Sequence, residues 1–314
     1  MRIAFFGTPD VAVPSLHALV AAPHIDVVCV VTNPDRPKGR SATPVASPVK
    51  HAALSHGLDV LQPERPRDIA EKLDAMQLDA CAVVAYGALL PRDVLAIPAH
   101  GFVNLHFSLL PRWRGAAPVQ WAIRSGDTHT GITTFVLDEG MDTGPTLTSL
   151  TVALQPNDTT ESVLDDLSRK GAPLLVDAIT GLVAGTIVPT PQPADGATLA
   201  PKIRRDDVAL DFAGSAQEID ALTRSADPQP GAHARFRDDT IKVFRARHTD
   251  ENYEPAAPGT IVALTRNGPV VACGEGHVII ETAQLPGKPR RDGASLINGA
   301  RLSVGEQFHN GVLT

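Results

Sequence analysis

An amide and an imidazole two residues apart are the side chains of this sequence best suited to chemistry. Asn104 and His106 stand at the end of Phe102–Leu105, a run typical of a buried strand. Alternate residues of a strand share a face, so both side chains would project together from its carboxyl end, where open α/β sheets bind ligands. The pair could stabilise and protonate a tetrahedral intermediate. A hydrogen-bonded structural pair would have the same spacing, so the spacing leaves both interpretations open.

An acidic loop could supply a carboxylate to this imidazole. The segment 138–145, which contains Asp138, Glu139 and Asp142, joins two predicted strands. A nearby carboxylate would hold an imidazole and favour its charged form. A polar turn with glycines at positive φ would have the same composition. The loop alone therefore does not assign a role to Asp142.

The first predicted turn lacks the marks of a nucleotide site. Gly7-Thr8-Pro9 follows a strand and precedes a helix, but it offers one glycine, and neither GxGxxG nor a P-loop pattern occurs in the chain. These absences disfavour a dehydrogenase or an ATPase.

The elements that must position these residues alternate between strands and helices, which predicts a parallel α/β sheet. The helix that begins near Thr159 is expected to be interrupted at Gly171-Ala172-Pro173. The predicted strands are Ile3–Phe6, Val27–Val31, Ala80–Ala85, Phe102–Leu105, Ile132–Leu137 and Leu147–Leu154, and the other predicted helices are Val11–Val20, Ser47–Ser55 and Ile69–Met76.

The composition changes at Val188–Gly196, where three prolines at alternate positions indicate an extended connector. Short β-like runs separated by Gly and Pro turns follow it, which predicts a small barrel of about 100 residues. We therefore predict one domain over residues 1–187, a proline-rich linker over 188–206 and a second domain over 207–314.

Length and composition bound the class of protein. With 314 residues, 43% of them hydrophobic, the chain should form about two ordered domains. No apolar run is long enough for a membrane span, and the first residues resemble a strand rather than an export signal. The three cysteines lack CxxC spacing, which argues against disulfides and zinc and favours the cytoplasm.

The net charge of −7 does not by itself exclude a nucleic-acid partner. Residues 201–314 contain 14 of the 28 lysines and arginines of the chain. Clusters such as Lys202–Arg205, Arg235–Arg247 and Lys288–Arg291 could contact phosphates, although a solvated charged surface would have the same composition.

Several motifs in a fixed order resemble those of the formyltransferases that use 10-formyltetrahydrofolate, in the branch that acts on methionyl-tRNA. Both halves of the chain contribute, and Ser108–Pro118 is the most specific part. The matching segments are Phe6–Pro9, Asn33–Arg40, Ser47–Lys50, Val84–Gly87, Asn104–Trp121, Asp142–Gly144, Leu285–Lys288 and Asn298-Gly299.

This resemblance implies a fold and a mechanism. The fold would be α/β, a Rossmann-like formyltransferase domain with a parallel-rich sheet followed by an OB-like β-barrel. Asn104 would donate to the formyl oxygen, and His106 would stabilise the oxyanion and move protons between the attacking amine and the leaving folate nitrogen. Asp142 would set the charge and orientation of His106. The attack would be direct, through a tetrahedral intermediate, and would need no metal.

The resemblance also implies how the substrates bind. Ser108-Leu109-Leu110-Pro111 would bind the folate, and Leu90 would border its pterin pocket. Arg40 would contact the acceptor end of initiator methionyl-tRNA, whose acceptor arm the barrel would hold. We expect a cytoplasmic monomer without a membrane partner.

Three other functions fit parts of the sequence. A formyltransferase for a small amine would share the first domain, but it would not need the tRNA-binding tail. A formyltetrahydrofolate hydrolase would be expected to carry another module ahead of the strand that begins here at Arg2. An RNA-binding barrel attached to an inactive domain would be expected to lack Asn104, His106 or Asp142.

Overall fold

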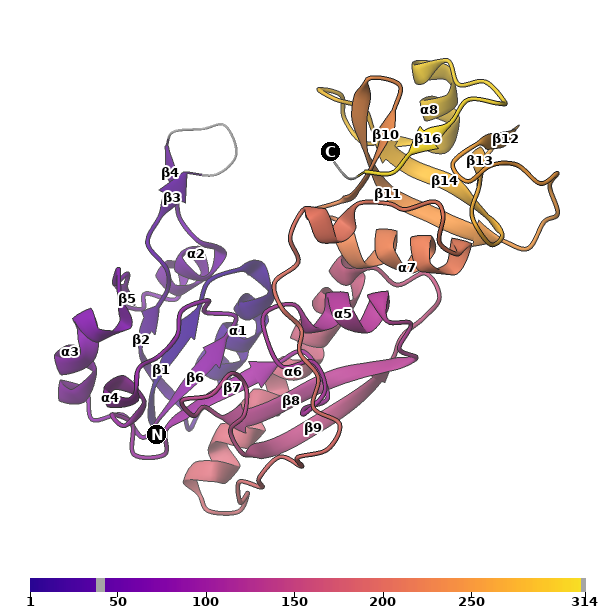
Figure 1. Ribbon diagram of the computed structural model, residues 1–314. Helices are drawn as coiled ribbons and strands as arrows, with labels where there is room; N and C mark the ends of the chain where they lie inside the picture. The colour runs from indigo at the N-terminus through magenta and orange to yellow at the C-terminus, as the bar shows by residue number, and fades with distance from the viewer. Residues whose placement is uncertain (38–42, 312–314) are drawn as a thin grey trace. The chain divides into compact units, whose positions relative to one another are not determined.

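The computed structural model describes residues 1–37 and 43–311, and the chain divides into two compact units (Figure 1). Unit 1 consists of Met1–Pro118, His129–Ala153 and Leu164–Pro201. Unit 2 consists of Val119–Thr128, Leu154–Val163 and Lys202–Thr314. No helix in the described ranges is long and apolar enough to cross a membrane.

Unit 1 is built on a seven-stranded sheet with the order β5-β2-β1-β6-β7-β8-β9. The strands from β5 to β7 in this order are parallel to one another, whereas β8 pairs antiparallel with both β7 and β9. This confirms the predicted parallel-rich α/β sheet. The strands are β1 (Arg2–Gly7), β2 (Asp26–Val31), β5 (Val60–Leu61), β6 (Ala80–Val84), β7 (Phe102–His106), β8 (His129–Val136) and β9 (Thr146–Ala153).

Helix α2 begins where the sequence provides a cap. Ser47 accepts a hydrogen bond from the Lys50 backbone N–H (3.0 Å) and Pro48 occupies the first helical position, so α2 starts as predicted. The helices are α1 (Val13–Ala21), α2 (Pro48–Ser55), α3 (Ala70–Ala75), α4 (Arg92–Leu95), α5 (Pro118–Arg124) and α6 (Thr160–Val183), and β3 (Arg36–Pro37) pairs with β4 (Pro44–Val45).

Helix α6 is continuous, so the predicted interruption at Gly171-Ala172-Pro173 is wrong. An internal proline costs a helix about 3 kcal/mol. The face of α6 that includes Leu167, Leu175 and Ile179 is fully buried, and each such side chain contributes about 1.5–3 kcal/mol. A side chain at Gly171 would collide with Leu105 of β7, so the glycine allows close packing on the sheet. Burial therefore outweighs the cost of the proline.

One core cluster of unit 1 extends into the loop that follows β6. The ring of Phe6 makes edge contacts with Tyr86 (5.3 Å between centroids) and with Phe102 (5.2 Å). Leu90 is partly buried and packs against this cluster. The cluster gives this loop a rigid base.

Unit 2 is an antiparallel sheet with the order β12-β13-β14-β11-β10-β16. A bridge between Thr260 and Gln307 joins the two ends of this path, which closes the sheet and confirms the predicted barrel. Its strands are β10 (Ala232–Phe236), β11 (Asp239–Thr249), β12 (Ile261–Thr265), β13 (Gly268–Ala272), β14 (His277–Gln284), β15 (Arg291–Asp292) and β16 (Phe308–His309).

Helices α4 and α5 were not predicted from the sequence, and neither were α7 (Ala216–Ala226) and α8 (Gly293–Ala300). Both α7 and α8 have an N-cap that could have been read. Ser215 and Glu218 form a reciprocal capping box at α7, and the Asp292 side chain accepts from the Ser295 N–H at α8.

All three cysteines are buried. Burial raises the pKa of the Cys29 thiol to about 11 and that of Cys273 to about 12, and it also raises the pKa of Cys81. The thiols are therefore protonated and inert at neutral pH.

The segment 188–200, which follows α6, is called the strap below. Figure 1 shows it crossing unit 1 near β9. It forms no helix; Thr190 pairs with Thr146 at the start of β9, and Leu199 pairs with Arg114 in the loop after β7.

Candidate active site

Strand β7 places Asn104 and His106 on the same face of the sheet, whereas Leu105 between them faces α6. The Asn104 side chain is half-buried, and within residues 1–37 and 43–311 it has no hydrogen-bond partner. Its amide can therefore bond to water or to a ligand. Asn104 is therefore a candidate for a group that bonds to a ligand.

His106 lies between a carbonyl and a carboxylate. Its Nε2 is 2.9 Å from the Trp113 carbonyl oxygen, and its Nδ1 is 3.7 Å from Asp142 Oδ2. A carbonyl can only accept, so Nε2 carries a proton and donates it. In the neutral ring Nδ1 is then unprotonated and can take up a proton. The nearby carboxylate would stabilise the cation that results.

Asp142 is held by the loop after β7, although it belongs to the loop between β8 and β9. Its Oδ2 accepts a hydrogen bond from the Gly115 N–H at 2.7 Å. Gly115 has φ +124°, and a Cβ there would lie 2.7 Å from the Ala200 carbonyl oxygen, so glycine is required. Asp142 (φ 54°) and Trp113 (φ 65°) also have left-handed backbones, which are enriched at functional sites.

The segment Ser108–Pro111, predicted to bind folate, is fixed to β8. The Thr133 hydroxyl donates to the Ser108 carbonyl (2.7 Å) and accepts from the Leu110 N–H (3.1 Å). Leu109 packs on Gly131, where any side chain would collide with it. The segment is thus rigid before a ligand binds.

The loops after β1, β2 and β6 are also tied together at this edge of the sheet. The Tyr86 carbonyl accepts from the Asn33 amide (2.9 Å) and from the Thr8 hydroxyl (3.3 Å). The Asp35 carboxylate accepts from Lys50 Nζ at 2.6 Å, and hydrogen bonds from Lys50 and Gln62 lower its pKa.

The structure brings His106 and Asp142 together and places Asn104 beside His106 on β7. It does not relate Arg40 to them, because Arg40 lies outside the described residues. Sequence reasoning missed Thr133 and Thr198; the Thr198 hydroxyl accepts from the Trp113 N–H at 2.9 Å. Neither threonine stands in a motif that could have marked it.

Family models match both parts of the chain. A model described as "Formyl transferase" matches residues 1–179, and one described as "Formyl transferase, C-terminal domain" matches residues 202–301. The chain belongs to the formyl transferase family.

Curated relatives are similar along nearly the whole chain. The proteins named methionyl-tRNA formyltransferase in Frankia alni and Myxococcus xanthus are each 44% identical to it. Each similarity covers 98% of this chain, and it covers 94% of the Frankia protein and 97% of the Myxococcus protein.

Solved structures share the fold at low sequence identity. A variant of HypX from Aquifex aeolicus matches 98% of this chain with a TM-score of 0.69 and 17% identity, and the chain spans 50% of its length. The sugar 3N-formyl transferase WlaRD matches 92% of this chain and 99% of its own, with a TM-score of 0.67 and 17% identity.

Proposed function

We propose that this protein transfers the formyl group of 10-formyltetrahydrofolate to the amino group of initiator methionyl-tRNA in the cytoplasm, producing N-formylmethionyl-tRNA for translation initiation. The observation that carries the proposal is the 44% identity to proteins named methionyl-tRNA formyltransferase across both units. WlaRD, named as a sugar formyl transferase, is only 17% identical. A small sugar amine is therefore the less favoured acceptor.

The free amide of Asn104 supports a role as the donor to the formyl oxygen. Negative charge develops on this oxygen when the methionyl amine adds to the formyl carbon. An N–H group that is already oriented stabilises such a charge, and losing one donor typically costs about 2.7–4 kcal/mol. The buried strand β7 fixes the backbone from which the Asn104 amide projects.

His106 would move the proton that the reaction must relocate. As the new C–N bond forms, the attacking amine loses a proton, which His106 accepts at Nδ1. His106 then donates this proton to the folate nitrogen as the bond from the formyl carbon to that nitrogen breaks. The Asp142 carboxylate, 3.7 Å from Nδ1, would stabilise the intervening imidazolium.

The residues present suit the folate that supplies the formyl group. The Ser108–Pro111 turn is held by Thr133, and Leu90 presents an apolar side chain from the loop after β6. We propose that these two elements bind the pterin ring, which is flat and carries hydrogen-bonding groups on its edge. A structure of HypX in complex with tetrahydrofolic acid has the same fold, with a TM-score of 0.66.

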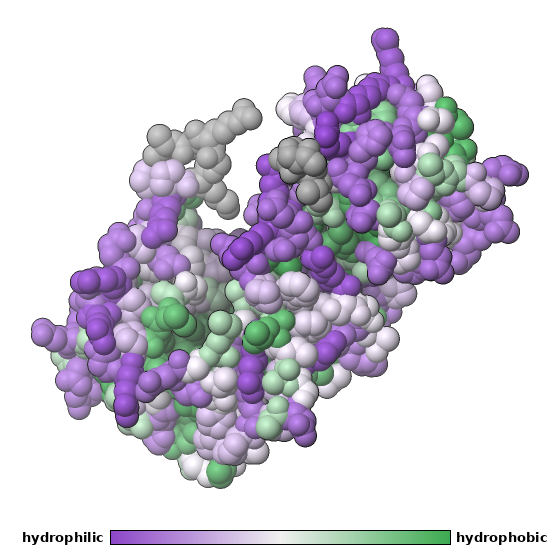
Figure 2. Space-filling view, in the orientation of Figure 1, coloured by the Kyte–Doolittle hydropathy of each residue, from purple (hydrophilic) through white to green (hydrophobic). Residues whose placement is uncertain are grey.

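Unit 2 uses several of its basic residues for internal ion pairs. Lys288 and Arg291, by contrast, have no carboxylate partner among the described residues, and both line a cavity of about 440 Å³ beside α8. Hydrophilic residues cover much of the visible face of this unit (Figure 2). We propose Lys288 and Arg291 as contacts to tRNA phosphates. The internal pairs are Arg237–Glu306, Arg245–Asp220, Arg247–Glu281 and Arg290–Asp227.

A formyl-transfer assay with three acceptors tests the proposed function. The purified protein and 10-formyltetrahydrofolate are mixed with charged initiator tRNA, charged elongator tRNA or free methionine. We expect product only with the initiator. An additional reaction offers an amino sugar nucleotide, and faster transfer to this acceptor than to the initiator tRNA would overturn the proposal.

The same assay tests Arg40, which we propose as a contact to the acceptor end of the tRNA. Arg40→Ala should raise the KM for methionyl-tRNA about tenfold, the scale of one lost charged hydrogen bond. The KM for the folate should not change. Arg36→Ala removes an exposed arginine four positions earlier in the sequence and serves as the control. Weaker folate binding by the Arg40 variant would contradict this role.

A further inference from the structure

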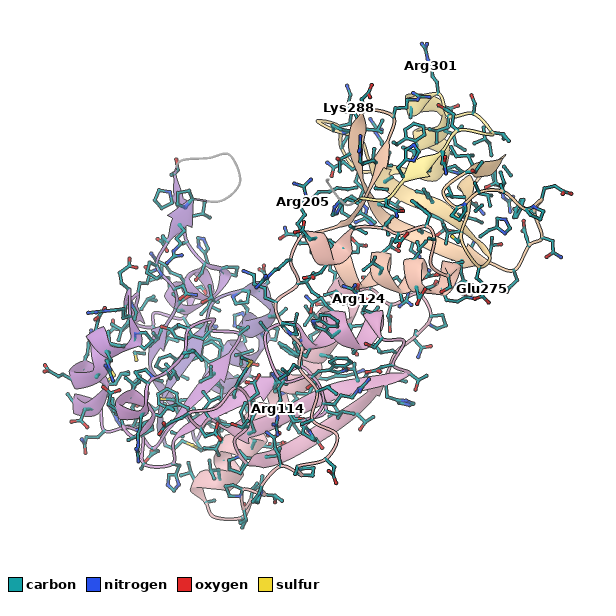
Figure 3. All side chains as sticks on the ribbon, in the orientation of Figure 1. Arg114, Arg124, Arg205, Glu275, Lys288 and Arg301 are labelled. Carbon is teal, nitrogen blue, oxygen red and sulfur yellow. The ribbon has the colours of Figure 1, made fainter. Side chains whose placement is uncertain are left out.

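One side chain of the strap reaches both loops that hold His106. Gln192 is half-buried, and its Nε2 donates to the carbonyl oxygens of Asp142 and Gly144, each at 2.8 Å. Its Oε1 accepts from Arg114 Nε (3.1 Å) and Arg114 Nη2 (2.6 Å). Figure 3 labels Arg114 in unit 1. The amide thus uses both of its donors and both lone pairs of its oxygen.

The turn that Gln192 holds has a constrained backbone. Asp142 has a left-handed backbone (φ 54°), and a side chain at Gly144 would collide with the Val136 carbonyl. The two carbonyls that Gln192 bonds flank this turn. Without the Gln192 amide, these carbonyls lose the hydrogen bonds that fix their direction. The direction of the Asp142 side chain is then no longer fixed either.

The loop on the other side of Gln192 carries the remaining contacts of His106. Arg114 lies between Trp113, whose carbonyl accepts from His106, and Gly115, whose N–H donates to Asp142. The strap supports the same loop through its backbone, because the Thr198 carbonyl accepts from the Arg114 N–H at 2.9 Å. Gln192 therefore links the loop that carries the Trp113 carbonyl to the turn that carries the Asp142 carboxylate, the two groups between which the imidazole lies.

We propose that Gln192 is a positioning residue for formyl transfer, which sets the Asp142 carboxylate relative to His106. This inference rests on the proposed function of the same site. Gln192 acts through Asp142 and does not touch the substrates, so its loss should lower kcat and leave both KM values nearly unchanged.

Two variants separate the bonds of Gln192. Gln192→Ala removes all four, whereas Gln192→Glu keeps an oxygen for Arg114 and loses the N–H donors to Asp142 and Gly144. We expect kcat to fall at least about tenfold in both, because small misplacements of reacting groups cost this much or more. Thr190→Ala is the control on the strap, since Thr190 pairs with Thr146 through backbone groups. All variants are assayed well below their melting temperatures.

A double-mutant cycle distinguishes positioning from general support of the fold. In an Asp142→Ala background, Gln192→Glu should cause less than a twofold further loss of kcat, because the group that it positions is gone. A further tenfold loss there, or kcat of Gln192→Glu within twofold of the parent protein, would overturn the inference. Absence of transfer by the unmodified protein would instead refute the proposed function.

Discussion

Both units contain a histidine beside an aspartate, but the two aspartate carboxylates differ in how many hydrogen-bond donors they have. In unit 2, His248 Nδ1 lies 3.1 Å from Asp220 Oδ2, and the same carboxylate accepts from Arg224 Nε (2.7 Å) and Arg245 Nη1 (2.8 Å). It also accepts from the His248 backbone N–H at 3.0 Å. Four donors therefore converge on Asp220, which is 3% exposed.

The His106–Asp142 pair in unit 1 has fewer hydrogen bonds than the His248–Asp220 pair. Among the described residues, Gly115 is the one hydrogen-bond donor to the Asp142 carboxylate, and the amide of Asn104 nearby has no partner. Polar groups that hold a fold are normally satisfied within the protein, since unmade bonds are costly. The comparison separates a structural pair from a candidate catalytic pair without any motif.

The largest expected effect is the loss of stability when Asp220 and its hydrogen bonds are removed. Asp220→Ala leaves Arg224 and Arg245 without their shared partner, which should cost about 3–5 kcal/mol in the free energy of unfolding. Urea denaturation measures this loss. Asp238→Ala, at an exposed position of the same unit, is the control. The kcat of the folded Asp220 variant should stay within about twofold of the parent protein, and a hundredfold fall would invalidate the comparison.

For Asn104 and His106 in unit 1 we expect the reverse, a large fall in kcat rather than a large loss of stability. Asn104→Ala and His106→Ala should each lower kcat at least about 100-fold, because each removes a group that acts on the reacting atoms. For Asn104→Ala the free energy of unfolding should change by less than about 1 kcal/mol, since no protein hydrogen bond is lost. His248→Ala is the matched histidine control and should keep its activity. Near-normal turnover of Asn104→Ala would show that its role is misassigned.

The smallest expected effect is a change with pH in the contribution of Asp220 to the unfolding free energy. Burial would raise the pKa of Asp220, but the hydrogen bond from Arg224 and the charge of Arg245 outweigh it and lower this pKa below its ordinary value of 3.8. A lowered pKa stabilises the fold above pH 3.8, and this contribution is lost as the pH falls through the folded-state value. The difference in unfolding free energy between the parent protein and Asp220→Asn should therefore shrink from pH 5 to pH 3. A difference that stays constant over this range would argue against the ion pairs.

The main strands of unit 1 and the shared face of Asn104 and His106 could be predicted, because both follow from local apolar patterns. The role of Asp142 could not be derived from spacing, since it stands in a different loop from His106. The resemblance to a family suggested it, and the structure places its carboxylate 3.7 Å from the ring. The catalytic roles themselves, and the domain boundaries at 187 and 206, stay predictions.

The contacts that pattern analysis missed all depend on the tertiary structure. In the sequence Gln192 is an ordinary polar residue between prolines. Its contacts arise only because the strap folds against the turn that contains Asp142. Pro173 normally marks a break, but the packing of α6 on β7 overrides it. The basic clusters of unit 2 look alike in sequence, yet Asp220 in α7 and Asp227 directly after α7 pair with Arg245 and Arg290.

The burial of all three cysteines has a practical consequence for spectroscopy. Cys29, Cys81 and Cys273 are inaccessible and protonated, so maleimide dyes should not modify the folded chain. A cysteine introduced at an exposed position would then accept a fluorophore at that position alone. One such cysteine in each unit would allow energy transfer to follow both units while methionyl-tRNA binds, without first replacing a native cysteine.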